Sequence, residues 1–128
     1  MNRVRNTRAT NATRIAFGLL LLAIISASLF PGVSRPTIFA SDKMDHIFAF
    51  FVLGSAAKFF WQGHRPITLF SLLALGGAGI EIVQWGMQAG READWADFAA
   101  DLFGAGVGIL MADTINAIRT RLFGPAYL

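Results

Sequence analysis

The sequence predicts an all-α fold, a polytopic membrane four-helix bundle with short loops. Hydrophobic residues make up 55% of the 128-residue chain and charged residues only 15%, a composition too apolar for an ordinary soluble domain. Apolar runs of helical length follow one another along the chain, with short polar connections between them. Because the hydrocarbon core of a membrane holds no water to satisfy backbone groups, runs that cross it must be helical. We therefore expect one compact helical domain.

The first element is an apolar segment behind a basic tail. Residues 1–14 form the predicted N-terminal tail, and residues 15–30 carry no charge and stop at Pro31-Gly32. This length fits a first membrane span. A cleaved signal peptide is the alternative, because a basic front, a short apolar core and small residues at 26–28 are typical of one.

Three further spans complete the predicted bundle. They cover residues 44–61, 66–85 and 98–118. The membrane domain therefore extends over residues 15–118, and a short C-terminal tail covers residues 119–128.

The basic residues predict the orientation of these spans, since Lys and Arg in short loops collect on the cytoplasmic side of a membrane. With the N-terminus in the cytoplasm, that side holds Arg3, Arg5, Arg8, Arg14, Lys58, Arg65, Arg119 and Arg121. The opposite side holds only Arg35, Lys43 and Arg91. We therefore expect both termini in the cytoplasm and the two long polar connections on the outer face.

Polar side chains gather at one predicted level, on the outer side of the bundle. The expected cluster consists of Asp42, Lys43 and His46 at the second span, Glu81 and Gln84 at the third, and Arg91, Asp97 and Asp101 at the fourth. Residues three or four apart share a helix face, so Asp97 and Asp101 lie on one stripe with Gly104 and Gly108. Small residues let a neighbouring helix approach closely. We expect this stripe to face the interior of the bundle.

Helix capping accounts for some of these charges without any ligand. Asp42 with Asp45, and Asp94 with Asp97, have the spacing of an N-cap followed by an acid at the third helical position. Acids at this end of a helix also interact favourably with its dipole.

Glu81 and Asp101 fit capping less well, because both lie deeper in their spans. An unpaired charge at such a depth costs about 2.5–3.5 kcal/mol on insertion scales. Both acids therefore need partners, and Lys43 and Arg91 are the expected ones. A structural ion pair and a binding site both remain open interpretations.

Composition removes several classes of function. The chain contains no cysteine, which excludes disulfides, thiolate nucleophiles and cysteine-ligated metals. The net charge of +3 is concentrated in the arginines before the first apolar run, where it orients a membrane protein and does not indicate a nucleic-acid partner.

Three motifs together resemble the VanZ-like family of membrane proteins. They are "SDKMDHIFAFFVLG" at the second span, "EIVQ" at the end of the third and "GREADWADFAADLFGAGVG" leading into the fourth. The resemblance covers about residues 40–112. The matching positions are Asp42, Lys43, His46, Glu81, Gln84, Arg91, Asp97, Gly104 and Gly108. Asp101 departs from the pattern, which has Asn at this position.

The resemblance implies a small multi-pass protein of the bacterial cell envelope, placed in the inner (cytoplasmic) membrane. The family is named for a member that raises resistance to the glycopeptide teicoplanin. We expect a non-enzymatic protein that binds a lipid-linked or cell-wall ligand at the outer membrane face, or organises partners there. The other expected partner is the lipid bilayer itself, and no cofactor is expected.

The alternative is an enzyme that acts on a lipid-linked phosphate. Lys43 and Arg91 would hold the anion, His46 would act as acid or base, and Glu81 or Asp101 would orient it. A variant of this alternative uses a Mg or Mn ion held by His46, Glu81, Asp97 and Asp101. Proton or ion movement along buried acids is disfavoured, because no polar residue is evident in the cytoplasmic halves of the spans.

Overall fold

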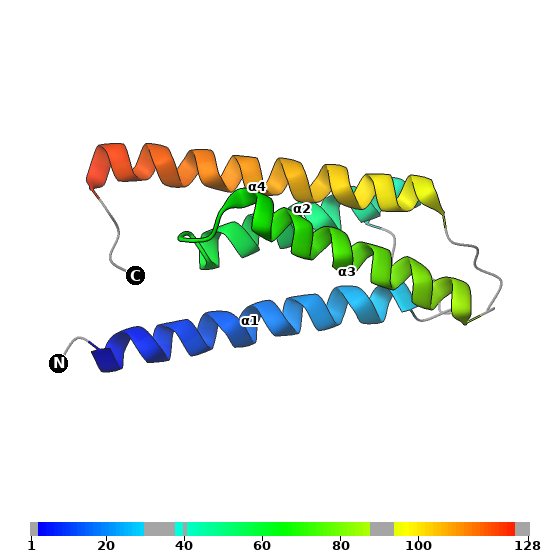
Figure 1. The fold of residues 1–128 in the computed structure, drawn as a ribbon, viewed down its shortest axis with the longest axis horizontal. Helices are drawn as coiled ribbons and strands as arrows, with labels where there is room; N and C mark the ends of the chain where they lie inside the picture. Colours follow the sequence, from blue (N-terminus) through cyan, green and yellow to red (C-terminus); the bar gives the residue numbers. More distant parts are fainter. Residues whose placement is uncertain (1–2, 30–37, 40, 88–93, 125–128) are drawn as a thin grey trace.

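Four long helices make up the structure, a computed structural model that describes residues 3–29, 38–39, 41–87 and 94–124, with side chains from residue 11 onward. The helices are α1 (Arg3–Leu29), α2 (Asp42–Phe60), α3 (Pro66–Gly86) and α4 (Trp95–Phe123). Figure 1 shows successive helices running in opposite directions, so that the start of α1 and the end of α4 lie at the same end of the bundle. The predicted all-α four-helix bundle is confirmed.

The helices are longer than the predicted spans at the two ends of the chain. Helix α1 begins at Arg3, inside the predicted tail, and α4 continues to Phe123, past the predicted limit of residue 118. Polar residues end a membrane span, but they do not end a helix. The added turns at both ends contain no Pro or Gly, so the helices continue through them. Helix α4 ends at Gly124, whose φ of 78° lies in the left-handed region that favours glycine.

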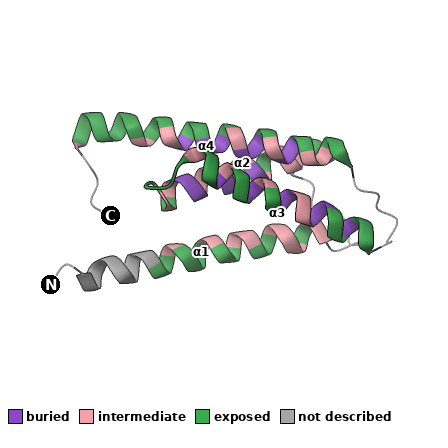
Figure 2. Ribbon diagram, in the orientation of Figure 1, coloured by how far each residue is buried: buried purple, intermediate pink, exposed green. Residues whose placement is uncertain are grey.

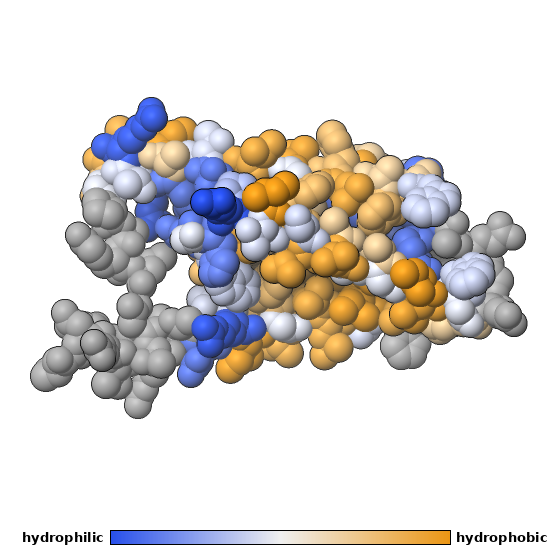
Figure 3. All heavy atoms as spheres, in the orientation of Figure 1, coloured by the Kyte–Doolittle hydropathy of each residue, from blue (hydrophilic) through white to orange (hydrophobic). Residues whose placement is uncertain are grey.

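Length and composition suit three of the described helices to crossing a membrane. These segments are Asn11–Leu29, Pro66–Gly86 and Trp95–Phe123. Helix α2, which covers most of the predicted span over 44–61, is not among them, since acidic residues and Lys43 lie in its first turn and Lys58 near its end. Figure 3 shows apolar side chains over the middle of the visible face and polar side chains gathered toward its ends. This distribution supports a membrane protein.

Helix α2 lies at the centre of the bundle and packs most extensively against α4. Figure 2 shows buried residues along α2, α3 and α4, whereas α1 is covered only in part. The core contains Phe50, Leu53, Ala57, Leu69, Leu73, Ile80, Ala105 and Ile109. Helix α1 adds partly buried side chains such as Phe17, whose ring meets that of Trp61 edge-on at 4.9 Å between centroids.

Glycines set the distance between α2 and α4. A Cβ atom at Gly104 would overlap the carbonyl oxygen of Ile47, and one at Gly108 would overlap that of Phe51. The Ser55 hydroxyl also donates to the carbonyl of Gly108 at 3.3 Å. The two backbones are therefore in direct contact, as the spacing of the two glycines predicts.

A second polar contact lies at the opposite end of this interface, in the halves of the spans that were predicted to be apolar. Lys58 is only 4% exposed, and its Nζ lies 2.9 Å from Oδ1 of Asp113 on α4. Its Nζ also donates to the carbonyls of Gln62 and His64, just after α2 ends. The expectation that the cytoplasmic halves of the spans carry no polar residue was therefore wrong. Lys58 follows Gly54 by one helical turn, and this places it on the face that meets α4.

The close approach predicts unequal responses to alanine at two glycines of α4. Gly104→Ala should destabilise the bundle by about 1–3 kcal/mol, because the new methyl group meets backbone that cannot move independently. Gly106→Ala is the matched control, since its Cβ would meet only the Phe70 ring at 3.6 Å. The control should be neutral, or more stable by up to about 1 kcal/mol through helix propensity. Thermal melts in detergent measure both, and equal shifts would contradict close packing at Gly104.

Candidate polar binding site

The candidate site lies at the end of the bundle where α2 and α4 begin and α3 finishes. These three helix ends meet because the chain alternates direction. They carry most of the cluster predicted from the sequence. We call its described members the polar cluster: Asp42, Lys43, His46, Glu81, Asp94, Asp97 and Asp101.

Lys43 joins the first turns of α2 and α4. Its Nζ lies 3.0 Å from Oδ2 of Asp94 and 3.0 Å from Oδ1 of Asp97. These hydrogen bonds, first that to Asp97, raise the pKa of Lys43 above its ordinary value. Lys43 and Asp94 are half-exposed, with 49% of each side chain accessible, whereas Asp97 is more enclosed at 16%. The lysine is therefore already neutralised by carboxylates.

His46 and Asp101 form the most buried pair of the cluster. Nδ1 of His46 lies 2.8 Å from Oδ1 of Asp101, and the Asp101 side chain is 2% accessible. An ionised carboxylate only accepts hydrogen bonds, so with Asp101 ionised the Nδ1–H of His46 donates to it. The other ring nitrogen, Nε2, lies 3.9 Å from Oδ2 of Asp97. Asp101 was expected to pair with Lys43 or Arg91. It does not pair with Lys43, which lies one turn nearer the end of the bundle, and Arg91 is outside the described residues.

Glu81 reaches the cluster from α3. Its Oε2 accepts the backbone N–H of Asp94 at 3.0 Å, the residue that precedes α4. The second oxygen of Glu81, Oε1, is buried and has no hydrogen-bond partner among the described residues. The same is true of Oδ2 of Asp101, which faces α3 at Gly77. Two buried carboxylate oxygens therefore lack donors in the described part of the chain.

One predicted site residue lies elsewhere, and another falls outside the part of the chain that the structure describes. Gln84 belongs to a different contact, since its Nε2 donates to the carbonyl of Ser28 at 2.8 Å and so ties α3 to the end of α1. Gln84 lies almost one helical turn beyond Glu81 along α3, where its side chain reaches the end of α1. Arg91, the second expected cation, lies outside the described residues.

The capping hypothesis holds for α4 and is wrong in part for α2. Asp94 is the N-cap of α4, and its Oδ1 accepts the N–H of Ala96 at 2.8 Å. This hydrogen bond, followed by that from Lys43, lowers the pKa of Asp94. The N-cap of α2 is Ser41 and not Asp42. Asp45 accepts the backbone N–H groups of residues 38 and 39, and so holds the incoming chain.

A metal ion would find a different set of ligands from the predicted one. Among the described residues, ligand atoms of Asp42, His46 and Asp97 lie within 4.8 Å of one another. Glu81 and Asp101 are not in this group. Asp101 instead contacts Nδ1 of His46. A carboxylate that orients a histidine in this way is common behind metal ligands. Lys43 competes for the same site, since it already binds Asp97.

The electrostatics of the polar cluster favour positively charged ligands. Within it, carboxylates outnumber cations even when His46 is protonated, and Lys43 is bound between two acids. An anion would therefore meet no unpaired cation among the described side chains of the cluster. A cationic group would instead find carboxylate oxygens that lack a donor.

No protein-family model, no curated protein and no solved structure matches the chain. The chemistry of the site therefore follows from its own geometry.

Asp94 combines a helix cap with an ion pair, and two substitutions separate these roles. Asp94→Ala removes both, whereas Asp94→Ser keeps a capping oxygen and loses only the contact with Lys43. At neutral pH the alanine variant should melt several degrees lower than wild type, and the serine variant should stay close to it. The small effect of serine follows from the exposure of the ion pair.

The advantage of wild type over Asp94→Ala should shrink in acid. Folding lowers the pKa of Asp94 below 3.8, so its ionised form stabilises the fold above that value. This contribution is lost as the pH falls through the lower, folded-state pKa. Thermal melts at neutral pH and at about pH 3 measure the change. A gap between the two proteins that is independent of pH would show that the charge of Asp94 contributes nothing.

Proposed function

We propose that the chain is a VanZ-like integral membrane protein of the bacterial cell envelope, and that its polar cluster binds a positively charged group without chemical turnover. The proposal rests on which charged groups of the cluster have partners and which do not. Lys43 is bound by two carboxylates, while buried oxygens of Glu81 and Asp101 lack donors among the described residues. Such a site suits ligand binding and offers no positive pocket for an anion.

The arrangement of the three motifs supports the VanZ-like part of the proposal. Lys43 and His46 from the first motif contact Asp97 and Asp101 from the third, and Glu81 from the second reaches the same helix end. Motifs separated by tens of residues in the sequence thus contribute side chains to one site. On this basis we extend the proposal to the property for which the family is named, protection against teicoplanin-type glycopeptides.

The enzyme hypothesis retains one observation in its favour. A buried carboxylate that holds Nδ1 of a histidine is the arrangement that orients a general base, and His46 with Asp101 has this geometry. Its weak point is Lys43, which was expected to hold a phosphate and is instead occupied by carboxylates. We therefore rank phosphate chemistry second.

The orientation proposed for the bundle places both termini in the cytoplasm and the polar cluster at the outer face of the inner membrane. Alkaline phosphatase is active only outside the cytoplasm, so fusions report the side directly. Fusions after "FASD" and after "QAGR" should be active, and fusions after "WQGH" and at Leu128 should be silent. Activity at Leu128 would move the cluster to the cytoplasmic side.

The binding function predicts that wild-type protein, extracted gently in detergent, retains a small molecule in native mass spectrometry. Glu81→Gln and Asp97→Asn should each reduce the retained fraction, because each removes a negative charge of the cluster. Asp113→Asn is the matched control, since it removes a carboxylate at the opposite end of the interface between α2 and α4 and should leave retention unchanged.

Two results would count against this function. Bare wild-type protein in every preparation, or equal retention by all variants, would contradict ligand binding at the polar cluster. Hydrolysis of an added lipid-linked phosphate by wild type, lost in His46→Ala, would instead favour the enzyme hypothesis. Melting curves of the variants verify that each is folded.

A further inference from the structure

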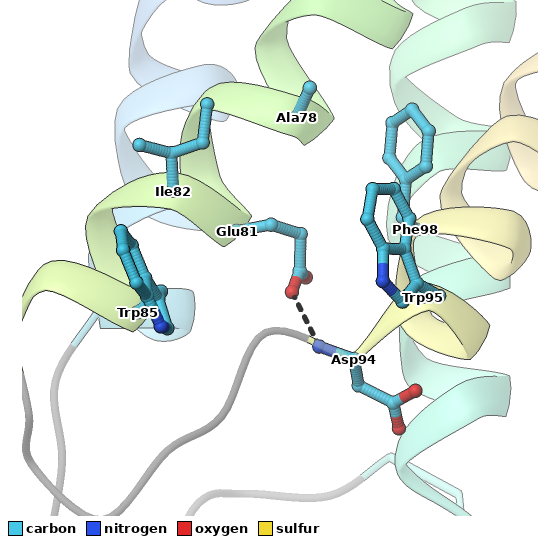
Figure 4. Close-up of a pocket in the computed structure, with 7 residues that line it drawn as sticks. All are labelled: Ala78, Glu81, Ile82, Trp85, Asp94, Trp95 and Phe98. Carbon is cyan, nitrogen blue, oxygen red and sulfur yellow. Dashed lines mark hydrogen bonds between the residues drawn. The ribbon is translucent and has the colours of Figure 1, made fainter.

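A pocket of about 180 Å³ opens between the end of α3 and the start of α4. Ala78, Glu81, Ile82, Trp85, Asp94, Trp95 and Phe98 line it (Figure 4). Ile82, Trp85 and Trp95 are 66%, 67% and 82% exposed, so the pocket opens on the side of the bundle and not into its core. In a membrane, this side faces lipid near the interface, where tryptophans concentrate.

Two carboxylates line the pocket, those of Glu81 and Asp94, and Glu81 is the one that lacks a donor. Figure 4 shows Glu81 projecting from α3 between two apolar walls, with its hydrogen bond to the N–H of Asp94. Glu81 is 7% exposed, and its Oε1 has no partner among the described residues. The nearby carboxylate of Asp94 is already neutralised by Lys43. Oε1 of Glu81 is thus an acceptor without a donor among the described side chains, and it is buried directly behind the apolar lining of the pocket.

We propose that this pocket binds a phospholipid whose headgroup ends in a primary ammonium, as in phosphatidylethanolamine. When the Glu81 side chain turns its buried Oε1 toward the pocket, an ammonium N–H donates to this oxygen and supplies the positive charge that a buried carboxylate requires. A quaternary ammonium, as in phosphatidylcholine, has no N–H to donate. Anionic headgroups such as phosphatidylglycerol bring charge of the wrong sign to Glu81.

The walls of the pocket fit the aminoethyl end of such a headgroup. Trp85, Trp95 and Phe98 offer aromatic rings, whose faces attract an ammonium group. The volume slightly exceeds that of a cavity of about 150 Å³ known to hold benzene, so it accepts an aminoethyl group.

The surface beside the pocket fits an acyl chain. Leu75, Ala78 and Ile82 follow at intervals of three and four residues on one face of α3, and Leu75 is 70% exposed. An acyl chain therefore finds an apolar track that leads away from the pocket along the helix.

This inference rests on the proposed binding function, because Glu81 and Asp94 belong to the polar cluster, and it specifies the ligand class. The test is native mass spectrometry of delipidated full-length protein, titrated with phosphatidylethanolamine, phosphatidylcholine and phosphatidylglycerol of matched acyl chains. Wild type should bind the ethanolamine lipid about tenfold more tightly than either of the others, the difference expected for one charge-assisted hydrogen bond.

Two variants probe the pocket separately. Glu81→Gln keeps the shape but removes the charge, and should abolish the preference for ethanolamine while leaving weak binding of all three lipids. Ala78→Phe fills the space and should reduce binding of the ethanolamine lipid even though Glu81 remains. Ala99→Phe is the matched control, because Ala99 is exposed on α4 outside the pocket lining, and it should bind as wild type does.

Equal affinity of wild type for the three lipids, or an unchanged preference in both pocket variants, would overturn the inference. Tighter binding of phosphatidylglycerol would overturn it as well, and would indicate an anion site. Retention of some other ligand, sensitive to Glu81→Gln and Asp97→Asn, would leave the proposed binding function intact while rejecting this lipid. Melts of Ala78→Phe and Ala99→Phe separate lost binding from lost folding.

Discussion

The direct contact between the backbones of α2 and α4 is the constraint on which the rest of the structure depends. At Gly104 and Gly108 a side chain of any size would meet a carbonyl oxygen of α2. In a membrane, van der Waals contact between helices replaces the hydrophobic effect as a source of association, so such close approach matters more than it does in water. It also permits few relative positions of the two helices, and this fixes which polar groups can meet.

Both ends of that interface carry polar contacts, and one alignment of α2 along α4 forms them all. At one end Lys43 and His46 contact acids on α4, and at the other Lys58 contacts Asp113. Separating the helices would take Asp113 from Lys58 and His46 from Asp101, and losing a charge partner is costly in an apolar environment. Packing and pairing therefore favour one arrangement of α2 on α4.

The remaining helices give the site its asymmetry. Helix α3 brings Glu81 to the start of α4, where its carboxylate accepts the N–H of Asp94, and a pocket opens beside this contact on the side of the bundle. Helix α1 is attached mainly by partly buried side chains and by the hydrogen bond from Gln84 to the carbonyl of Ser28. One face of the cluster is thus closed by helix packing while another stays accessible to a ligand.

The sequence by itself determined the helices, their apolar character and the meeting of polar residues at one end. Those properties depend on local composition and on the helical repeat, which can be read from neighbouring residues. The tertiary structure alone decided the partners: Asp101 binds His46 and not Lys43, Gln84 turns to α1, and Lys58 is buried. Partner choice depends on the relative rotation and sliding of separate helices, and a difference of one turn changes which side chains touch. Backbone acceptors such as the Ser28 carbonyl leave no trace in the sequence, because every residue carries one.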